Sequence, residues 1–128
     1  MMIKKVDHIG IMVSDMEKSI LFYKDVLGLE LKNRVPHSDG IIELAFLGFG
    51  SDSETEVELI KGYNDSLPAE GKVHHFAVSV ENISEEFLKM KELGYVEVID
   101  PEIVVLPNGY KYFFIKGPDK EWIELFQR

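Results

Sequence analysis

The segment VDHIGIMVSDM, residues Val6 to Met16, returns 67 residues later as VHHFAVSVENI, residues Val73 to Ile83. In both copies apolar residues alternate with small or polar ones, which is typical of a β-strand. Each copy then reaches a residue suited to the N-cap of a helix, Asp15 or Asn82. A repeat of this length indicates that the chain contains the same arrangement of strands and helices twice.

The segments that follow correspond as well. Each contains apolar residues three or four positions apart, as on one face of a helix, and each reaches a glycine suited to a helix end, Gly28 or Gly94. Three extended stretches separated by turn residues complete each copy. The sequence therefore predicts an α+β fold of two tandem βαβββ units forming a curved mixed sheet, about residues 1–62 and 72–128 of a single domain spanning 1–128. The apolar helix positions are Met16, Ile20, Tyr23 and Leu27, then Ile83, Phe87, Met90 and Leu93.

Composition limits the functions that this chain can have. Its 128 residues, 45% of them hydrophobic, are enough for one domain with a core. With 14 Lys and Arg against 23 Asp and Glu, the net charge of −9 argues against nucleic-acid partners and against binding to an anionic membrane. No cysteine is present, which excludes disulfides and thiolate metal sites. The N-terminal residues resemble neither a signal peptide nor a membrane span, so a cytoplasmic protein is expected.

One histidine on the first strand and one glutamate on the last strand recur in both units. VELI in the first unit matches IELF in the second, which pairs Glu58 with Glu124, and His8 corresponds to His75. Neighbouring residues of a strand point to opposite faces, so we expect His74 to face away from the site that His75 serves. Two imidazoles and two carboxylates in the hollow of one sheet form a site for a divalent first-row metal. The predicted metal ligands are His8, Glu58, His75 and Glu124.

Apolar residues near these ligands could line a substrate site. Met12 shares the face of His8, while Phe113 and Trp122 belong to the strands around Glu124, as do Tyr112 and Phe126. Aromatic residues at strand spacing belong to the core more often than to a binding site. We therefore predict substrate contacts for Met12, Phe113 and Trp122, with core packing as the alternative. Glu56 shares the face of Glu58 but has no equivalent in the second unit, and we expect it at the rim.

These motifs resemble the vicinal oxygen chelate superfamily, whose type member is glyoxalase I (lactoylglutathione lyase). The resemblance covers essentially the whole chain and rests on DHIGIMVSDMEKSILFYKDVLGL, VELI, HHFAVSV and GPDKEWIELF. Glyoxalase I holds its metal with a histidine on the first strand and a glutamate on the last strand of each unit. The resemblance thus implies the same four ligands, a nickel, zinc or similar divalent ion, a small-molecule substrate and a homodimer.

The resemblance also implies a reaction. Glyoxalases isomerise the hemithioacetal of a 2-oxoaldehyde and a thiol to a 2-hydroxyacyl thioester. The metal acts as a Lewis acid on two neighbouring oxygens and stabilises an enediolate, while a glutamate moves the proton from one carbon to the next. By position Glu124 is the expected base, and Glu58 is a ligand that could also shuttle the proton.

The chain departs from glutathione-using glyoxalases at three positions. Met12 stands where those enzymes have an arginine, Gly62 where they have an asparagine, and Leu106 where they have a basic residue, although Asn64 and Lys111 lie near the last two in sequence. The cations that would hold the carboxylates of glutathione are thus largely missing. Another thiol, or another substrate with vicinal oxygens, is left open.

Three other functions within the superfamily compete with this interpretation. A methylmalonyl-CoA epimerase would use a similar metal site with Glu43 near its base, although it has a longer segment between the units than this chain. Extradiol dioxygenases use two histidines and one carboxylate around iron, and a fourth ligand at Glu58 argues against them. Bleomycin-resistance-type proteins bind a drug without metal and need no such ligands. The four ligands could meet within one chain or across a dimer interface.

Overall fold

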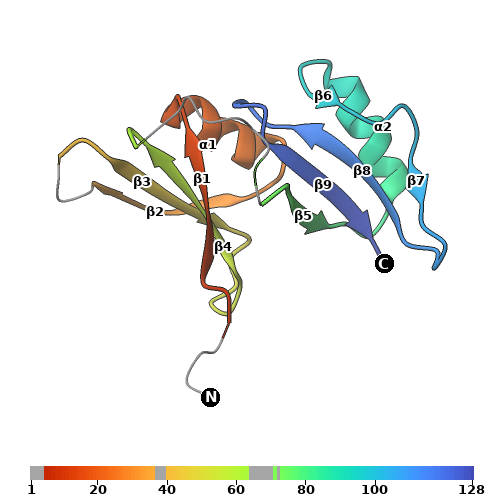
Figure 1. The fold of residues 1–128 in the computed structure, drawn as a ribbon, viewed down its shortest axis with the longest axis horizontal. Helices are drawn as coiled ribbons and strands as arrows, with labels where there is room; N and C mark the ends of the chain where they lie inside the picture. The colour runs from red at the N-terminus through yellow and green to blue at the C-terminus, as the bar shows by residue number, and fades with distance from the viewer. Residues whose placement is uncertain (1–4, 37–39, 64–70, 72) are drawn as a thin grey trace. The chain divides into compact units, whose positions relative to one another are not determined.

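The computed structural model describes residues 5–36, 40–63, 71 and 73–128 (Figure 1). The chain divides into two compact units, Met1–Leu67 and Pro68–Arg128. Each unit has its own sheet and its own helix. Most of the predicted linker, and Asn64 with it, lies outside the described residues.

The first unit is a four-stranded sheet with one helix. It contains β1 (His8–Val13), α1 (Met16–Asp25), β2 (Glu30–Pro36), β3 (Glu43–Gly48) and β4 (Glu56–Lys61). The strand order is β1-β4-β3-β2, with β1 parallel to β4 and the other pairs antiparallel (Figure 1). The first and last strands of the unit are therefore neighbours, although residues 14–55 separate them along the chain.

The second unit repeats this plan with one difference. It contains β5 (Phe76–Ser79), α2 (Ile83–Leu93), β6 (Glu97–Val98), β7 (Val104–Val105), β8 (Lys111–Lys116) and β9 (Trp122–Gln127). The order is β5-β9-β8-β6, with β5 parallel to β9 and with β7 also paired to β8. The predicted βαβββ plan is confirmed, but its second strand is split into β6 and β7.

The split between β6 and β7 has a local cause. Pro101 cannot donate a backbone hydrogen bond, and the carboxylate of Asp100 replaces part of the strand ladder. Asp100 Oδ2 accepts the backbone N–H of Phe114 at 2.7 Å, and the N–H of Ile99 donates to the Phe114 carbonyl at 2.8 Å. A side chain thus occupies the edge of β8 that a continuous strand would otherwise cover.

Both helices begin at the predicted residues. The side chains of Asp15 and Asn82 each accept a backbone N–H of the first turn, at 3.0 and 3.2 Å. Gly94 ends α2 in the left-handed conformation (φ 75°), as predicted, whereas α1 ends at Asp25 and Gly28 (φ 80°) follows the helix. Neither helix is long and apolar enough to cross a membrane, in the part of the chain that is described.

Each sheet buries one face under its helix. Alternate residues of the central strands pack against α1 or α2, and they include Ala45, Leu47, Val57 and Leu59 in the first unit and Phe113, Ile115, Ile123 and Leu125 in the second. The Phe113 ring lies 5.0 Å from the ring of Phe87 on α2 and is 0% exposed. Phe113 therefore points to the helix side of β8 and packs in the core, which is the alternative to its predicted contact with substrate.

Candidate metal centre

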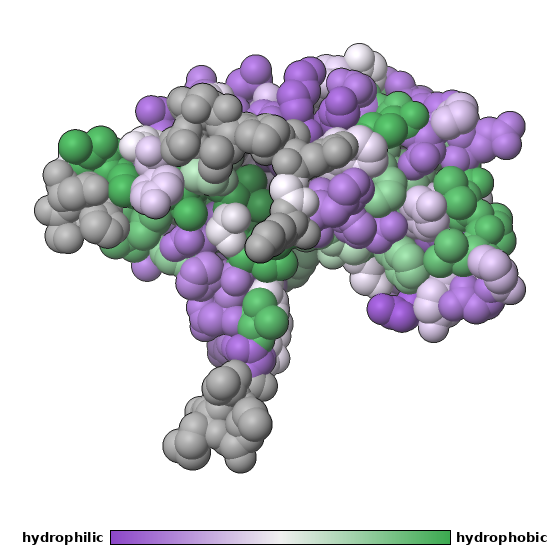
Figure 2. Space-filling model, in the orientation of Figure 1, coloured by the Kyte–Doolittle hydropathy of each residue, from purple (hydrophilic) through white to green (hydrophobic). Residues whose placement is uncertain are grey.

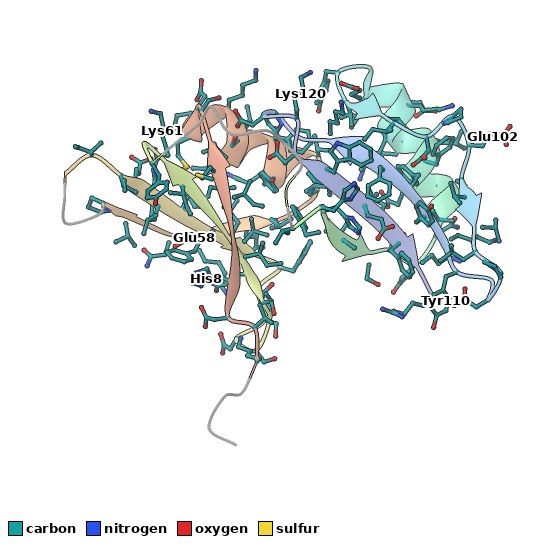
Figure 3. The ribbon with its side chains drawn as sticks, in the orientation of Figure 1. His8, Glu58, Lys61, Glu102, Tyr110 and Lys120 are labelled. Atoms are coloured by element: carbon teal, nitrogen blue, oxygen red, sulfur yellow. The ribbon has the colours of Figure 1, made fainter. Side chains whose placement is uncertain are left out.

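In the first unit His8 and Glu58 lie together on neighbouring strands. The parallel register of β1 and β4 places Gly10 opposite Glu58, and His8 is two residues before Gly10 on the same face. His8 Nε2 lies 3.6 Å from Glu58 Oε1 (Figure 3). A Cβ added to Gly10 would lie 3.3 Å from the same oxygen, so the glycine leaves room for the carboxylate between the strands. We call His8 and Glu58 the first half-site.

The second unit repeats this arrangement with His75 and Glu124. The register of β5 and β9 places Ala77 opposite Glu124, and His75 is again two residues earlier. His75 Nε2 lies 3.5 Å from Glu124 Oε1. We call His75 and Glu124 the second half-site. The equivalence seen in the sequence thus extends to the same pair of atoms at nearly the same distance.

The two separations, 3.6 and 3.5 Å, are too long for a hydrogen bond and slightly longer than the spacing of two ligands of one metal ion. Nitrogen and oxygen atoms that share a proton stand about 2.7–3.2 Å apart. Two ligands about 2.1 Å from one ion stand roughly 3.0–3.4 Å apart at octahedral to tetrahedral angles. Imidazole and carboxylate ligands also suit a divalent first-row ion. Among the described residues no group of three or more His, Asp or Glu side chains is placed to hold a metal ion, and each unit contributes one histidine–glutamate pair.

A phenylalanine packs against the histidine of each half-site. The antiparallel register places Phe46 opposite Glu58 and Phe114 opposite Glu124. The His8 ring lies 5.7 Å from the Phe46 ring, and the His75 ring lies 4.9 Å from the Phe114 ring, both edge to face at 84°. The sequence reasoning missed both phenylalanines. The sequence feature that could have identified them is an aromatic residue between two core residues of a central strand.

In the first half-site a carboxylate holds the second ring nitrogen of the histidine. His8 Nδ1 lies 2.8 Å from Asp7 Oδ2, and this contact raises the pKa of His8 and lowers that of Asp7. Hydrophilic residues cover this part of the surface, at the lower ends of β1 and β4 (Figure 2). The contact favours a proton on Nδ1, which leaves Nε2 free as a metal ligand on the side of Glu58.

In the second half-site the corresponding contact comes from His74. Its Nδ1 lies 2.9 Å from His75 Nδ1, and its ring lies 5.0 Å from the ring of Trp122 and 6.2 Å from that of Phe114. The prediction that His74 faces away from the site is wrong. Both histidines precede β5, so the alternation of a strand does not govern where their side chains point.

Burial changes the acidity of the Glu124 carboxyl group. This residue is 8% exposed, and its burial raises the pKa of the carboxyl group, against the lowering effect of His75 and together with the negative charge of Asp100. The rings of Phe114 and Trp122, 5.3 Å apart, lie on the same face of the sheet as Glu124. Glu124 therefore has a higher affinity for a proton than an ordinary glutamate.

The sequence profile of the Glyoxalase/Bleomycin resistance protein/Dioxygenase superfamily matches residues 5–125. The chain belongs to this superfamily. The uncharacterized protein YwbC of Bacillus subtilis (strain 168) is 57% identical to it, over 99% of this chain and 100% of that protein. A probable lactoylglutathione lyase of Synechocystis is 33% identical over 94% of this chain and 92% of that protein.

More distant relatives within the superfamily include enzymes with two different activities. The mitochondrial methylmalonyl-CoA epimerase of Bos taurus is 26% identical, over 90% of this chain and 68% of that protein. The solved structure of the trypanothione-dependent glyoxalase I of Leishmania major superposes with a TM-score of 0.81 at 28% identity, covering 97% of this chain and 86% of that one. These matches establish the glyoxalase fold.

Two other candidate residues, Met12 and Glu56, lie on the face of the first sheet that carries Glu58. Met12 pairs with Ile60 in the register, on the face of Glu58, and is half-buried. Glu56, on the same face, forms an ion pair with Lys32 at 2.8 Å. In the second unit Trp122 is half-buried on the face of Glu124, where its predicted contact with substrate stays a prediction.

Glu43, the base that an epimerase would need, lies on the other face of the first sheet. It is three positions from Phe46 on β3, so the two side chains point to opposite sides. Arg34 holds the Glu43 carboxylate with two hydrogen bonds, at 2.7 and 3.1 Å, and also pairs with Glu17 of α1. Arg34 therefore links this carboxylate to α1, and the carboxylate does not face the first half-site.

Proposed function

We propose that this chain is a metal-dependent glyoxalase-like lyase, which converts the hemithioacetal of a 2-oxoaldehyde and a thiol to a 2-hydroxyacyl thioester. The observation that carries the proposal is the repeated half-site, with Nε2–Oε1 distances of 3.6 and 3.5 Å in the two units. A relative named as a probable lactoylglutathione lyase, 33% identical over nearly the whole chain, supports it.

In this proposal the four half-site residues bind one divalent ion, nickel, zinc or a similar metal. When bound, the ion supplies Lewis-acid stabilisation of the negative charge that develops on two adjacent substrate oxygens. The protein would act as a homodimer, with the four ligands drawn from one chain or from both.

Glu124 is the proposed base. Its carboxylate takes the proton from the substrate carbon next to the carbonyl and returns it to the neighbouring carbon, so the same group serves as base and then as acid. The burial that raises its pKa brings its proton affinity closer to what this transfer requires. Glu58 serves as a metal ligand beside His8. Phe114 and Trp122 limit the access of water from their side of Glu124.

One feature of the structure favours the lyase over each of two alternative functions, the epimerase and the metal-free drug-binding protein. The carboxylate that would serve an epimerase, Glu43, is held by Arg34 on the opposite face of the sheet. The two half-sites both have intact histidine and glutamate ligands, which a metal-free drug-binding protein would not need. Met12 and Leu106, in place of cations, favour a thiol with less negative charge than glutathione.

The decisive experiment is a substrate panel on metal-depleted protein that is then loaded with Ni²⁺ or Zn²⁺. Methylglyoxal would be offered with glutathione, with cysteine and with an uncharged thiol, and methylmalonyl-CoA would be offered alone. We expect metal-dependent formation of a thioester with at least one thiol. Epimerisation of methylmalonyl-CoA without thioester formation would overturn the proposal, and so would a protein that binds no metal.

A further inference from the structure

The two half-sites differ in the group that contacts the Nδ1 atom of the histidine. In the first half-site this group is the Asp7 carboxylate, 2.8 Å from His8 Nδ1. In the second half-site it is the His74 ring, whose Nδ1 lies 2.9 Å from His75 Nδ1. Asp7 and His74 occupy equivalent positions of the repeat, each directly before the ligand histidine. Both half-sites also have a phenylalanine edge-on to the histidine.

A carboxylate at Nδ1 makes a histidine a stronger metal ligand. A carboxylate only accepts hydrogen bonds, so His8 must carry its proton on Nδ1 and present the lone pair of Nε2 to a metal. The negative charge also increases electron donation from the ring, and loss of such a partner typically weakens metal binding about 10–100-fold. In the first half-site His8 is therefore already in the tautomer that can bind a metal through Nε2.

An imidazole partner at Nδ1 does not favour one tautomer of the ligand histidine over the other. Of two facing Nδ1 atoms, one carries the proton and the other accepts it. When His75 is the donor, its Nε2 is free to bind a metal. When His74 is the donor, a neutral His75 carries its proton on Nε2 and cannot bind. The partner ring also brings no negative charge, and its packing on Trp122 fixes its position without changing this balance.

We propose that Asp7 and His74 are positioning residues that make the half-sites unequal, so that His8 and Glu58 anchor the metal and His75 and Glu124 hold it less firmly. The inference rests on the proposed metal site and deepens it. Glu124 belongs to the weaker half-site, which is where a carboxylate must be able to release a metal in order to accept a proton. Asp7 is thus a determinant of metal affinity, and His74 is not.

The test measures Zn²⁺ affinity by competition with a chelator, on the full chain and without any substrate. Asp7→Asn keeps an oxygen acceptor but removes the charge, and should weaken Zn²⁺ binding about 10–100-fold. His74→Asn should change the affinity by less than about threefold, since a neutral partner replaces a neutral partner. His74→Asp copies the first half-site into the second and should tighten binding about 10-fold. Asp25→Asn, which removes an exposed carboxylate from α1, is the matched control for net charge.

The outcomes separate the inference from the proposed function. A wild-type protein that binds no Zn²⁺ would remove the metal site and the proposed function with it. Wild-type binding that Asp7→Asn leaves unchanged, or that Asp7→Asn and His74→Asn weaken equally, would overturn only the inequality of the half-sites. Nitrogen NMR of the histidine rings gives a second readout, since the inference expects a single Nδ1–H tautomer for His8 and a mixture for His75 in the metal-free protein.

Discussion

Replacing Glu124 with glutamine separates the two roles that this carboxylate would have. Glutamine has nearly the same size and keeps an oxygen that can ligate a metal, but it cannot accept the substrate proton. Glu124 is 8% exposed and lies 3.5 Å from His75 Nε2, so the amide would occupy the same space on β9. The substitution therefore tests proton transfer with little change in packing.

The expected loss of turnover follows from the removal of a general base. Such groups typically contribute about 10²–10⁴-fold, so Glu124→Gln should lower kcat by at least about 10²-fold, or roughly 3 kcal/mol of transition-state stabilisation. Metal binding should fall less, because an oxygen ligand remains. The matched control is Glu58→Gln in the first half-site, where we expect weaker metal binding and, at saturating metal, a smaller loss of turnover.

The same variant has a predicted effect on the stability of the metal-free protein. Burial raises the pKa of Glu124 above its ordinary value of 4.5, so the folded state binds this proton more tightly than the unfolded state. The ionised carboxylate thus lowers the free energy of unfolding at neutral pH, and stability is regained as the pH falls through the pKa of the folded state. Glu124→Gln, which is neutral at every pH, should be more stable than wild type at pH 7, with the difference shrinking in acid.

Three measurements check this reasoning: steady-state turnover with saturating metal, metal affinity by chelator competition, and chemical denaturation of the metal-free proteins between about pH 4 and 7. The assigned roles would be refuted if Glu58→Gln lost more turnover than Glu124→Gln with both proteins fully loaded. A Glu124→Gln variant that is less stable than wild type at pH 7 would contradict the effect of burial.

Three further predictions follow from the fold and the site. Phe113→Ala should destabilise the protein by about 3–5 kcal/mol in denaturant unfolding, whereas Tyr112→Ala, on the half-buried opposite face, should cost much less; equal losses would contradict the assigned faces of β8. Turnover of the methylglyoxal–glutathione adduct should be weak, with a high KM, and Met12→Arg should lower that KM; a low KM in the wild type would show that other residues bind the glutathione carboxylates. Native mass spectrometry should find a homodimer with one metal for each set of four ligands, and a metal-loaded, active monomer would disprove the dimer.

The repeat made much of the fold predictable. Strand alternation, helix periodicity and the capping residues Asp15 and Asn82 are local properties of the sequence. Each of them appears in both units, so an ambiguous pattern in one unit can be interpreted from the equivalent segment of the other. The repeat also paired residues that are neighbours in the structure. His8 and Glu58 are far apart in sequence, but equivalent residues in the second unit showed that the pair belongs together before any strand register was known.

Local patterns failed where a side chain's direction depends on strand boundaries or on register. The two histidines before β5 were assigned to opposite faces, but they precede the strand and contact each other through their Nδ1 atoms. The sequence alone does not show whether Phe113 or Phe114 is the neighbour of Glu124, because only the pairing of Phe114 with Glu124 shows which face of β8 lies beside that carboxylate.

The sequence by itself determined the two βαβββ units, their helix starts and the four candidate ligands, since these depend on residue type and on spacing within a repeat. Only the tertiary structure decided what surrounds each ligand. The Asp100 carboxylate that interrupts the second strand, the Arg34 that removes Glu43 from the site and the different partners of His8 and His75 are contacts between side chains. Such contacts depend on distances across the sheet and on which atoms face each other, and a linear pattern of residues contains neither.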